Sequence, residues 1–284
     1  MNIQWFPGHM TKTRRLIEEN LRLVDICIEI ADARLIISSR SPLLSDLIKN
    51  KPQLLIINKS DIADDAVNKE WMQWFKERKQ NALFVNSRDG GKLLNKVTDE
   101  IHKILAEKIK AKEEKGIVSK SVRAMVTGIP NVGKSTFINN ISGRKSAKTG
   151  DRPGVTTGKQ WITVPGIELL DTPGILSPKF LSETQGEHLA MSGAVRDAVF
   201  DTAELSCILL EFLRDNYSGL LCTRFKITDT ADLKGYEIME KICKSRGFIV
   251  RGGDFDYDRA SAIILDEFRS AKIGRISLER PSDI

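Results

Sequence analysis

The sequence predicts an α/β fold: a mostly parallel β-sheet with helices on both faces, followed by a small all-helical C-terminal domain. Up to about residue 170, short apolar runs rich in valine and isoleucine alternate with longer amphipathic stretches. This alternation is typical of a parallel sheet covered by helices. After Pro178 the strand-like runs fade and helical patterns remain. A length of 284 residues suggests about two domains, and we expect them at residues 1–180 and 181–284.

Each expected element follows from its local pattern of apolar residues. The expected strands are residues 25–30, 53–57, 82–85, 122–127, 160–164 and 167–170. The expected helices of the first domain are residues 11–23, 41–49, 66–79, 93–112 and 134–141. Those of the second domain are residues 186–200, 202–214, 231–246 and 256–271. A polar, lysine-rich connector occupies residues 111–121 of the first domain.

The composition is that of an ordinary globular protein, with 41% hydrophobic and 29% charged residues. Its four cysteines are scattered and form no CxxC pair, which argues against a disulfide scaffold and a cysteine-type zinc site. No apolar run approaches the roughly 18 residues needed to cross a bilayer, and the N-terminus lacks a signal-peptide pattern. We therefore expect a cytoplasmic protein without a membrane partner.

The net charge of +6 is unevenly distributed along the chain. Residues 101–152 carry 12 basic and 4 acidic side chains. Such a cluster can attract a nucleic-acid backbone, but it can equally be the solvated face of a lysine-rich helix. The charge by itself leaves both interpretations open.

The strongest motif is GIPNVGKST, which fits the phosphate-binding pattern GxxxxGK[ST] and lies between an expected strand and an expected helix. A loop of this kind points backbone N–H groups at phosphate oxygens, and the helix N-terminus adds its positive dipole end. Lys134 would reach the β- and γ-phosphates, and the Ser135 hydroxyl would bind Mg²⁺. The residues expected to bind phosphates in this loop are Asn131, Val132, Gly133, Lys134, Ser135 and Thr136.

Two further motifs predict a sensor of the γ-phosphate. The sequence DTPG follows the last apolar run; Asp171 can hold Mg²⁺ through its water shell, and the Gly174 N–H can face the γ-phosphate. The sequence DRPGVTT at residues 151–157 supplies a threonine that can bind Mg²⁺ when the γ-phosphate is present. We favour Thr156 over Thr157 for this role.

Guanine recognition is indicated by NKSD, which matches the NKxD motif through Asn58, Lys59 and Asp61. The Asp61 carboxylate can accept hydrogen bonds from both N1–H and the 2-amino group of guanine. Adenine lacks this pair of donors, and the resulting unpaired carboxylate discriminates against it. A weaker match follows the next expected strand, where a backbone N–H would face guanine O6. Its residues are Asn86, Ser87 and Arg88.

The order of these motifs is rotated relative to an ordinary GTP-binding domain. The guanine-recognition motif comes first, and the phosphate loop, the threonine segment and DTPG follow. Because the two ends of such a domain lie close together, joining them and cutting elsewhere keeps the same sheet. The sequence therefore predicts a circularly permuted P-loop G domain, with residues 111–121 as the join. The cut falls just after DTPG, so we expect the nucleotide state to reposition the C-terminal domain.

Taken together, these motifs resemble those of the circularly permuted GTPases of bacterial ribosome biogenesis, over essentially the whole chain. The resemblance is carried by QWFPGHM at residues 4–10, DAR at 32–34, NKSD at 58–61, GIPNVGKS at 128–135, KTGDRPG at 148–154, DTPG at 171–174, Gly252-Gly253, and Phe268-Arg269 through Gly274-Arg275. It implies a GTP-hydrolysing factor that binds a precursor of the large ribosomal subunit and couples hydrolysis to late maturation.

Catalysis in this family is expected to be unusual. Ile175 stands where many GTPases place a glutamine that orients the attacking water, and the family shares a hydrophobic residue there. We therefore expect slow hydrolysis alone and stimulation by a partner. The resemblance makes His9 a candidate catalytic group alongside Lys134 and Thr156, since an imidazole can orient water or act as a base. Helix capping, packing or RNA contact by His9 stays an alternative.

The resemblance also implies an ion and an RNA contact. Asn131 corresponds to the asparagine that helps to hold K⁺ in related enzymes, although a purely structural asparagine is the alternative. The C-terminal domain resembles a small RNA-binding module, in which basic residues form one face or an ordinary solvated surface. These residues are Lys241, Lys244, Arg246, Arg251, Arg259, Arg269, Lys272, Arg275 and Arg280.

The favoured function is that of a monomeric GTPase that binds GTP and GDP and uses Mg²⁺ and K⁺ as cofactors. Its expected partner is a precursor of the large ribosomal subunit. Three alternatives remain. One is a permuted GTPase that acts on another RNA, such as the small subunit. A second is an RNA-binding module that uses GTP only as a folding ligand. The third is a P-loop ATPase or kinase, against which the NKSD sequence argues.

Overall fold

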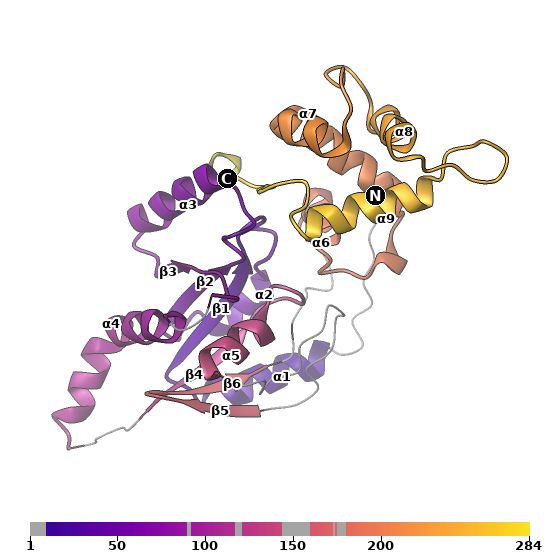
Figure 1. The fold of residues 1–284 in the computed structure, drawn as a ribbon. Coiled ribbons are helices and arrows are strands. Elements are labelled where there is room, and N and C mark those ends of the chain that lie inside the picture. The colour runs from indigo at the N-terminus through magenta and orange to yellow at the C-terminus, as the bar shows by residue number, and fades with distance from the viewer. Residues whose placement is uncertain (1–9, 90–91, 117–120, 144–159, 173, 175–179) are drawn as a thin grey trace. The chain divides into compact units, whose positions relative to one another are not determined.

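The computed structural model describes residues 10–89, 92–116, 121–143, 160–172, 174 and 180–284. They form two compact units (Figure 1). The sheet unit contains the described residues up to Phe180 together with residues 277–284, and the helical unit contains residues 181–276. The expected second domain, 181–284, thus differs from the helical unit in its last eight residues, which pack on the sheet unit.

The sheet unit is built on six strands in the order β3-β2-β1-β4-β6-β5. The strands are β1 (Ile26–Asp32), β2 (Gln53–Asn58), β3 (Ala82–Phe84), β4 (Val122–Thr127), β5 (Gln160–Val164) and β6 (Ile167–Asp171). All neighbours are parallel except β5 and β6, which are antiparallel. This confirms the predicted α/β class with a mostly parallel sheet.

Helices cover both faces of the sheet because both faces are apolar. The helices are α1 (Met10–Leu21), α2 (Pro42–Ile48), α3 (Asp65–Glu77), α4 (Leu93–Glu113) and α5 (Lys134–Ser142). On one face, α1 and α2 pack with Cys27 and Met125, and α3 packs through Trp71 over Leu55. The alternate residues of β1, such as Ile28, are also fully buried, and α4 and α5 contact the strands of the sheet.

The carboxyl ends of the central strands meet at one edge of the sheet. Asp32 at the end of β1 pairs with Asn58 at the end of β2, and Asp171 at the end of β6 pairs with Val126 of β4. From β1 the chain proceeds outward to β2 and β3, whereas β4 is followed by strands on the other side. Such a switch point between β1 and β4 is where α/β sheets bind ligands.

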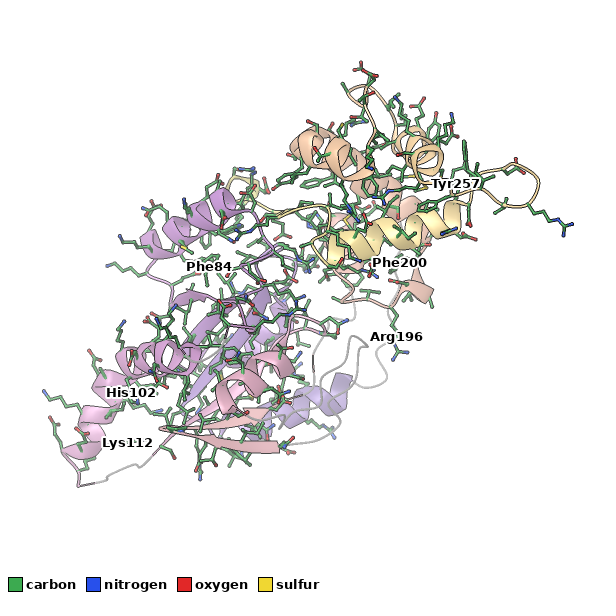
Figure 2. The ribbon with its side chains drawn as sticks, in the orientation of Figure 1. Phe84, His102, Lys112, Arg196, Phe200 and Tyr257 are labelled. Carbon is green, nitrogen blue, oxygen red and sulfur yellow. The ribbon has the colours of Figure 1, made fainter. Side chains whose placement is uncertain are left out.

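The basic segment expected to join the permuted halves begins as the end of α4. Figure 2 shows Lys112 on its last turns, and its ammonium lies 3.0 Å from Asp25, just before β1. Lys108 lies 3.6 Å from the same carboxylate. Burial alone would raise the pKa of Asp25, but the Lys112 contact, the Arg123 N–H and both lysine charges lower it below its usual value. Part of the basic excess is therefore used within the fold.

The helical unit consists of α6 (Glu183–Met191), a 3₁₀ turn (Asp197–Val199), α7 (Thr202–Phe225), α8 (Gly235–Arg246) and α9 (Tyr257–Arg269). The helix expected over 186–200 ends at Met191, and α7 continues past the expected end at residue 214 through a kink at Tyr217. Arg269, the last residue of α9, donates to the Met191 carbonyl at the end of α6 and to the Asp197 carboxylate in the 3₁₀ turn.

The last eight residues return to the sheet unit and form a C-terminal tail, defined here as residues 277–284. The Leu278 N–H donates to the Arg34 carbonyl over 2.6 Å. The Trp71 indole donates to the Glu279 carbonyl over 3.2 Å. The Glu279 carboxylate accepts from the N–H groups of Ile37 and Ser38 at 2.6 and 3.0 Å. The tail therefore fixes the loop that follows β1.

No helix among the described residues is long and apolar enough to cross a membrane. In the same part of the chain, no group of three or more histidine, cysteine or acidic residues is arranged to hold a metal ion.

Candidate nucleotide-binding site

The phosphate loop connects β4 to α5, as its sequence predicts. Gly133 caps α5 with a φ of 94°, a conformation that residues with a β-carbon rarely adopt. A β-carbon at this position would also overlap the side-chain nitrogen of Asn58. Glycine is therefore required twice here, once for the turn into the helix and once for the close approach of the guanine-recognition motif.

Lys134 is buried, with 7% of its surface exposed, and its ammonium donates to the Ile129 carbonyl over 2.7 Å. Burial lowers the pKa of Lys134 to about 8, and the nearby Asp171 carboxylate opposes this shift. Gly174 closes over the same point, since a β-carbon on it would lie 2.9 Å from the Lys134 nitrogen. The structure thus brings the phosphate loop and the DTPG motif together around one buried cation.

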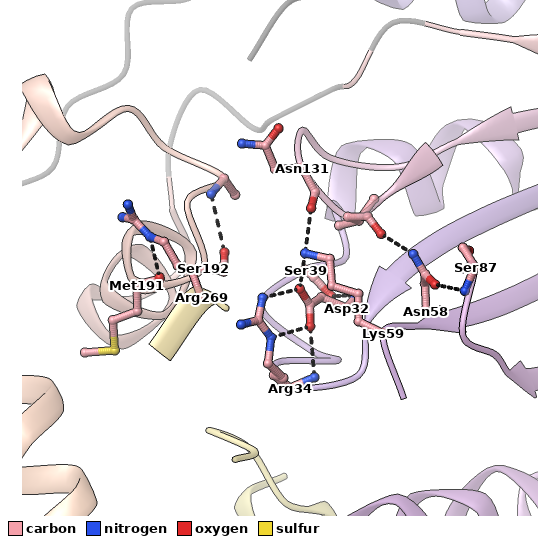
Figure 3. Close-up of polar contacts among 12 residues, drawn as sticks. Asp32, Arg34, Ser39, Asn58, Lys59, Ser87, Asn131, Met191, Ser192 and Arg269 are labelled. Carbon is pink, nitrogen blue, oxygen red and sulfur yellow. Dashed lines mark hydrogen bonds and ion pairs between the residues drawn. The ribbon is translucent and has the colours of Figure 1, made fainter. Parts of the chain in front are cut away.

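Asn58 joins the guanine-recognition motif to two other segments. Its side-chain nitrogen donates to the Val132 carbonyl over 2.8 Å, and its side-chain oxygen accepts from the Ser87 N–H over 3.0 Å (Figure 3). Asn58 is 2% exposed. In this structure its amide therefore braces the loops around the site.

Lys59 crosses from the same motif to the phosphate loop. Its ammonium lies 2.8 Å from the Asn131 carbonyl and 2.8 Å from the Asp32 carboxylate. Burial lowers the pKa of Lys59, while the Asp32 charge opposes that shift. Asp32 in turn accepts two hydrogen bonds from the Arg34 guanidinium. The end of β1 thereby becomes part of the site.

Asp61 differs from these residues in being exposed. No hydrogen bond or ion pair joins its side chain to another described residue. Its carboxylate is accordingly open to a ligand with two adjacent N–H donors, as the sequence-based assignment to guanine requires. Residues 86–88 are the weaker guanine-binding match predicted from the sequence. There the Arg88 N–H donates to the Asn86 side chain over 2.9 Å, and the Ser87 N–H donates to the Asn58 side chain. Both donors are engaged within the protein.

Two of the expected magnesium ligands, Asp171 and Ser135, lie among the described residues. Asp171 is 2% exposed, and its strand end is fixed by the Thr172 hydroxyl, which donates to the Val126 carbonyl over 2.8 Å. Ser135 occupies the first turn of α5. A carboxylate at the end of β6 and a hydroxyl at the start of α5 are the kinds of oxygen donor that Mg²⁺ prefers. His9, Thr156, Thr157 and Ile175 lie outside the described residues.

Sequence reasoning did not foresee the part played by Asp32, Arg34 and Glu279. The DAR sequence contributed only to the family resemblance, and the tail was grouped with the helical domain. One signal in the sequence was available: an acidic residue ending an apolar strand, with arginine two positions later. The Glu279 contact has no such signal, because its partner is 241 positions away.

Comparisons with known proteins agree with this geometry. The family described as "50S ribosome-binding GTPase" matches residues 123–220, a stretch that starts at β4, after the guanine-recognition motif. Ribosome biogenesis GTPase A of Bacillus pumilus is 43% identical over 282 residues, which are 99% of each chain. The protein of the same name from Thermotoga maritima is 30% identical over 99% of this chain and 96% of that one.

Solved structures are similar over nearly the full chain as well. GNP-bound YlqF from T. maritima has a TM-score of 0.66 at 26% identity and covers 96% of this chain and 100% of its own. A GDP-bound YlqF structure has a TM-score of 0.64 at 25% identity, with 95% and 100% coverage. This chain therefore belongs to the ribosome biogenesis GTPase A family, and it is a GTPase with a circularly permuted G domain.

Proposed function

We propose that this GTPase binds a precursor of the large ribosomal subunit in the cytoplasm and couples GTP hydrolysis to its late maturation. The observation that carries the proposal is the assembly of the phosphate loop, DTPG and NKSD at one edge of the sheet. The names of its relatives and the description of the matching family support a ribosomal partner. We further propose that the protein acts as a monomer.

For the nucleotide itself, the proposal assigns phosphate binding to the phosphate loop and to Gly174. Guanine binding is assigned to Lys59 and Asp61, with Asn58 and the segment 86–88 completing the pocket. Within the described residues, the exposed Asp61 carboxylate beside engaged neighbours supports the choice of guanine, because guanine offers two donors to one carboxylate.

Two cations belong to this proposal. GTPases in general use Mg²⁺, and here Ser135, Asp171 and Thr156 would hold it. The ion would neutralise charge on the phosphates. We propose K⁺ as a second ion, held with the help of Asn131. Asn131 has a φ of 61° in the loop, and its carbonyl is occupied by Lys59.

The catalytic step is proposed to depend on His9, Lys134 and Thr156. Lys134 stabilises the charge that develops on the phosphates. His9 orients the attacking water in place of the glutamine that Ile175 replaces. The resulting enzyme is slow by itself and is stimulated by its ribosomal partner.

The helical unit is proposed to contact RNA. It contains a cavity of about 550 Å³ whose lining includes the cations Arg224, Lys226, Arg246 and Lys272. Of these four, Arg246 and Lys272 belong to the basic face expected from the sequence; Lys272 pairs with Asp266, and Arg224 pairs with Glu267. Arg269 binds Asp197, and Arg280 lies in the tail beside Glu70. Because several of these cations pair with acids of the helical unit, the proposed RNA contact is smaller than the face expected from the sequence.

The test is GTP turnover by the purified protein in KCl, with and without large ribosomal subunits. We expect strong stimulation by large subunits, weak stimulation by small subunits, and loss of activity when NaCl replaces KCl. His9→Ala should remove the stimulated turnover and leave GDP binding intact.

The remaining outcomes separate the alternatives. Stimulation by small subunits would redirect the proposal to another RNA. Tight GTP binding without stimulated turnover would favour a binding module that uses GTP as a folding ligand. Displacement of bound GTP by ATP at similar concentration would favour an ATPase or kinase and would contradict the role of Asp61.

A further inference from the structure

Asp32 ends β1 as a buried carboxylate with two cationic partners. It is 2% exposed. The Arg34 guanidinium donates to both of its oxygens, at 3.0 and 2.8 Å, and the Lys59 ammonium lies 2.8 Å from it (Figure 3). Its backbone N–H donates to the Ser39 hydroxyl over 2.9 Å. The Asp32 side chain and backbone are therefore held by Arg34 and Ser39, two residues of the loop that follows β1.

A buried carboxylate without partners would be strongly disfavoured. Burial acts to raise the pKa of Asp32, but the charges of Arg34 and Lys59 and their hydrogen bonds outweigh it and hold that pKa below its usual value. Asp32 thus stays ionised at neutral pH. Its charge is available to hold the Lys59 ammonium, which burial would otherwise destabilise.

Lys59 transmits this constraint to the phosphate loop. The same ammonium that binds Asp32 donates to the Asn131 carbonyl over 2.8 Å. Lys59 itself has a φ of 62°, so its backbone is held in a conformation that few residues adopt without support. The ion pair supplies that support on one side, and the loop carbonyl supplies it on the other.

The loop that carries Arg34 is also held by the C-terminal tail, which is more than 200 residues away in the sequence. The tail donates to the Arg34 carbonyl through the Leu278 N–H, and the Glu279 carboxylate holds the N–H groups of Ile37 and Ser38. Glu279 is 7% exposed. Arg34 and Asp32 therefore form a rigid support.

We propose that Asp32 is a positioning residue for nucleotide binding: with Arg34 as its counter-ion, it holds Lys59 across the phosphate loop, so that the guanine-recognition motif and the phosphate loop are joined before the nucleotide arrives. This inference rests on the nucleotide site proposed above and is independent of the ribosomal partner. Preorganisation of this kind raises affinity because less ordering remains to be done on binding.

The test is a double-mutant cycle on GDP affinity, measured by fluorescence with a labelled GDP. Asp32→Asn should weaken binding by about tenfold, the loss expected for one charge-assisted hydrogen bond, and Lys59→Gln should weaken it at least as much, because Lys59 also bonds to the phosphate loop. Because Asp32 acts through Lys59, the double variant should lose no more affinity than Lys59→Gln alone, since the second change removes nothing more. A loss in the double variant equal to the product of the two single losses would overturn the proposal.

Glu29→Gln is the matched control. Glu29 is a second buried carboxylate of β1, 2% exposed, and it pairs with Arg40 at 2.9 Å. It has no contact with Lys59 among the interactions of the described residues. The variant should lose stability much as Asp32→Asn does, yet bind GDP like the parent protein. Equal losses of GDP affinity in both variants would reduce Asp32 to an ordinary structural acid.

Steady-state kinetics give a further discriminating measurement. Asp32→Asn should raise KM for GTP and leave kcat at saturating GTP unchanged, because bound nucleotide restores the arrangement. A fall in kcat with unchanged KM would contradict a positioning role. If Asp32→Asn does not fold, Asp32→Asn/Arg34→Gln removes both charges of the buried pair and carries the same expectations. Failure of guanine binding in the parent protein would instead contradict the proposed site.

Discussion

The two halves of the nucleotide site stabilise buried charge in different ways. The base side is defined here by Asp32 and the NKSD motif, and the phosphate side by the phosphate loop and DTPG. On the base side, the Asp32 carboxylate is shared by the Arg34 and Lys59 cations inside the protein, and the Asn58 amide is bonded at both ends. On the phosphate side, the buried Lys134 ammonium donates to a backbone carbonyl, and burial lowers its pKa to about 8. On the base side these contacts lie within the protein and the exposed Asp61 carboxylate faces solvent, whereas on the phosphate side the Lys134 ammonium has a neutral carbonyl partner, and a phosphate would be a stronger one.

This difference suggests a division of labour. A rigid base side preserves the geometry on which discrimination between bases depends, because a mismatched polar group then stays unpaired. On the phosphate side, the Lys134 ammonium would gain a charged partner when a phosphate binds, and this gain would contribute to the free energy of binding. The predictions below test whether the two sides are coupled, and how strongly each depends on its own charges.

The largest effect is expected where the two sides touch. Gly133→Ala places a β-carbon against Asn58 and strains a residue whose φ is 94°. GDP affinity should fall by at least roughly a hundredfold, as measured by calorimetry. Gly143→Ala is the control, because Gly143 ends the same helix at a φ of 61° with open space around it. Equal affinity losses in both variants would mean that helix strain alone matters.

A change at the exposed position of the base side should alter selectivity. Asp61→Asn converts an acceptor of two donors into a mixed donor and acceptor. Preference for GTP over xanthosine triphosphate should fall by roughly tenfold or more, as measured by competition against labelled GDP. Asp65→Asn, a nearby exposed acid, should leave the preference unchanged. Unchanged discrimination in Asp61→Asn would contradict its assignment to guanine.

A smaller effect is expected from the tail that supports the base side. Glu279→Gln weakens two charge-assisted hydrogen bonds to the loop after β1. The free energy of unfolding should fall by about 1–2 kcal/mol, as measured by urea denaturation. Asp283→Asn, at an exposed acid of the same tail, should change it by less than about 0.5 kcal/mol. Equal effects would show that the tail is not anchored through Glu279.

The smallest effect concerns the Lys134 proton. Its pKa of about 8 should rise when phosphates bind, so binding takes up a proton and affinity falls as the pH rises through 8. A lysine with this pKa is mostly neutral at pH 8.5, and GDP affinity should be about fourfold weaker there than at pH 7. Calorimetry in buffers of different ionisation enthalpy would measure the proton uptake.

Lys134→Arg is the reference for this pH profile, because arginine does not titrate in the range. Its GDP affinity should be independent of pH between 7 and 8.5. The same slope in the variant and in the parent protein would assign the titration to another group.

Much of the sheet unit was predictable because its signals are local. The strands expected at 53–57 and 122–127 are present as β2 and β4, since their apolar runs and flanking motifs are contiguous. The α6 region was less predictable: its helix ends at Met191, where the Ser192 N–H closes the last turn on the His188 carbonyl, and apolar periodicity does not mark such an end. The tail was misplaced because its partners are distant in sequence.

The sequence by itself determined the chemistry available to this protein. The patterns GIPNVGKST, DTPG and NKSD identify the expected nucleotide-binding residues by residue type and spacing. The order of these motifs along the chain indicates the circular permutation. Only the tertiary structure decided how these residues are coupled. The contacts of Asp32 with Lys59 and of Asn58 with Val132 join positions 27 and 74 apart. Such contacts depend on which strand ends become neighbours in the sheet, a property of the packed core that no local pattern encodes.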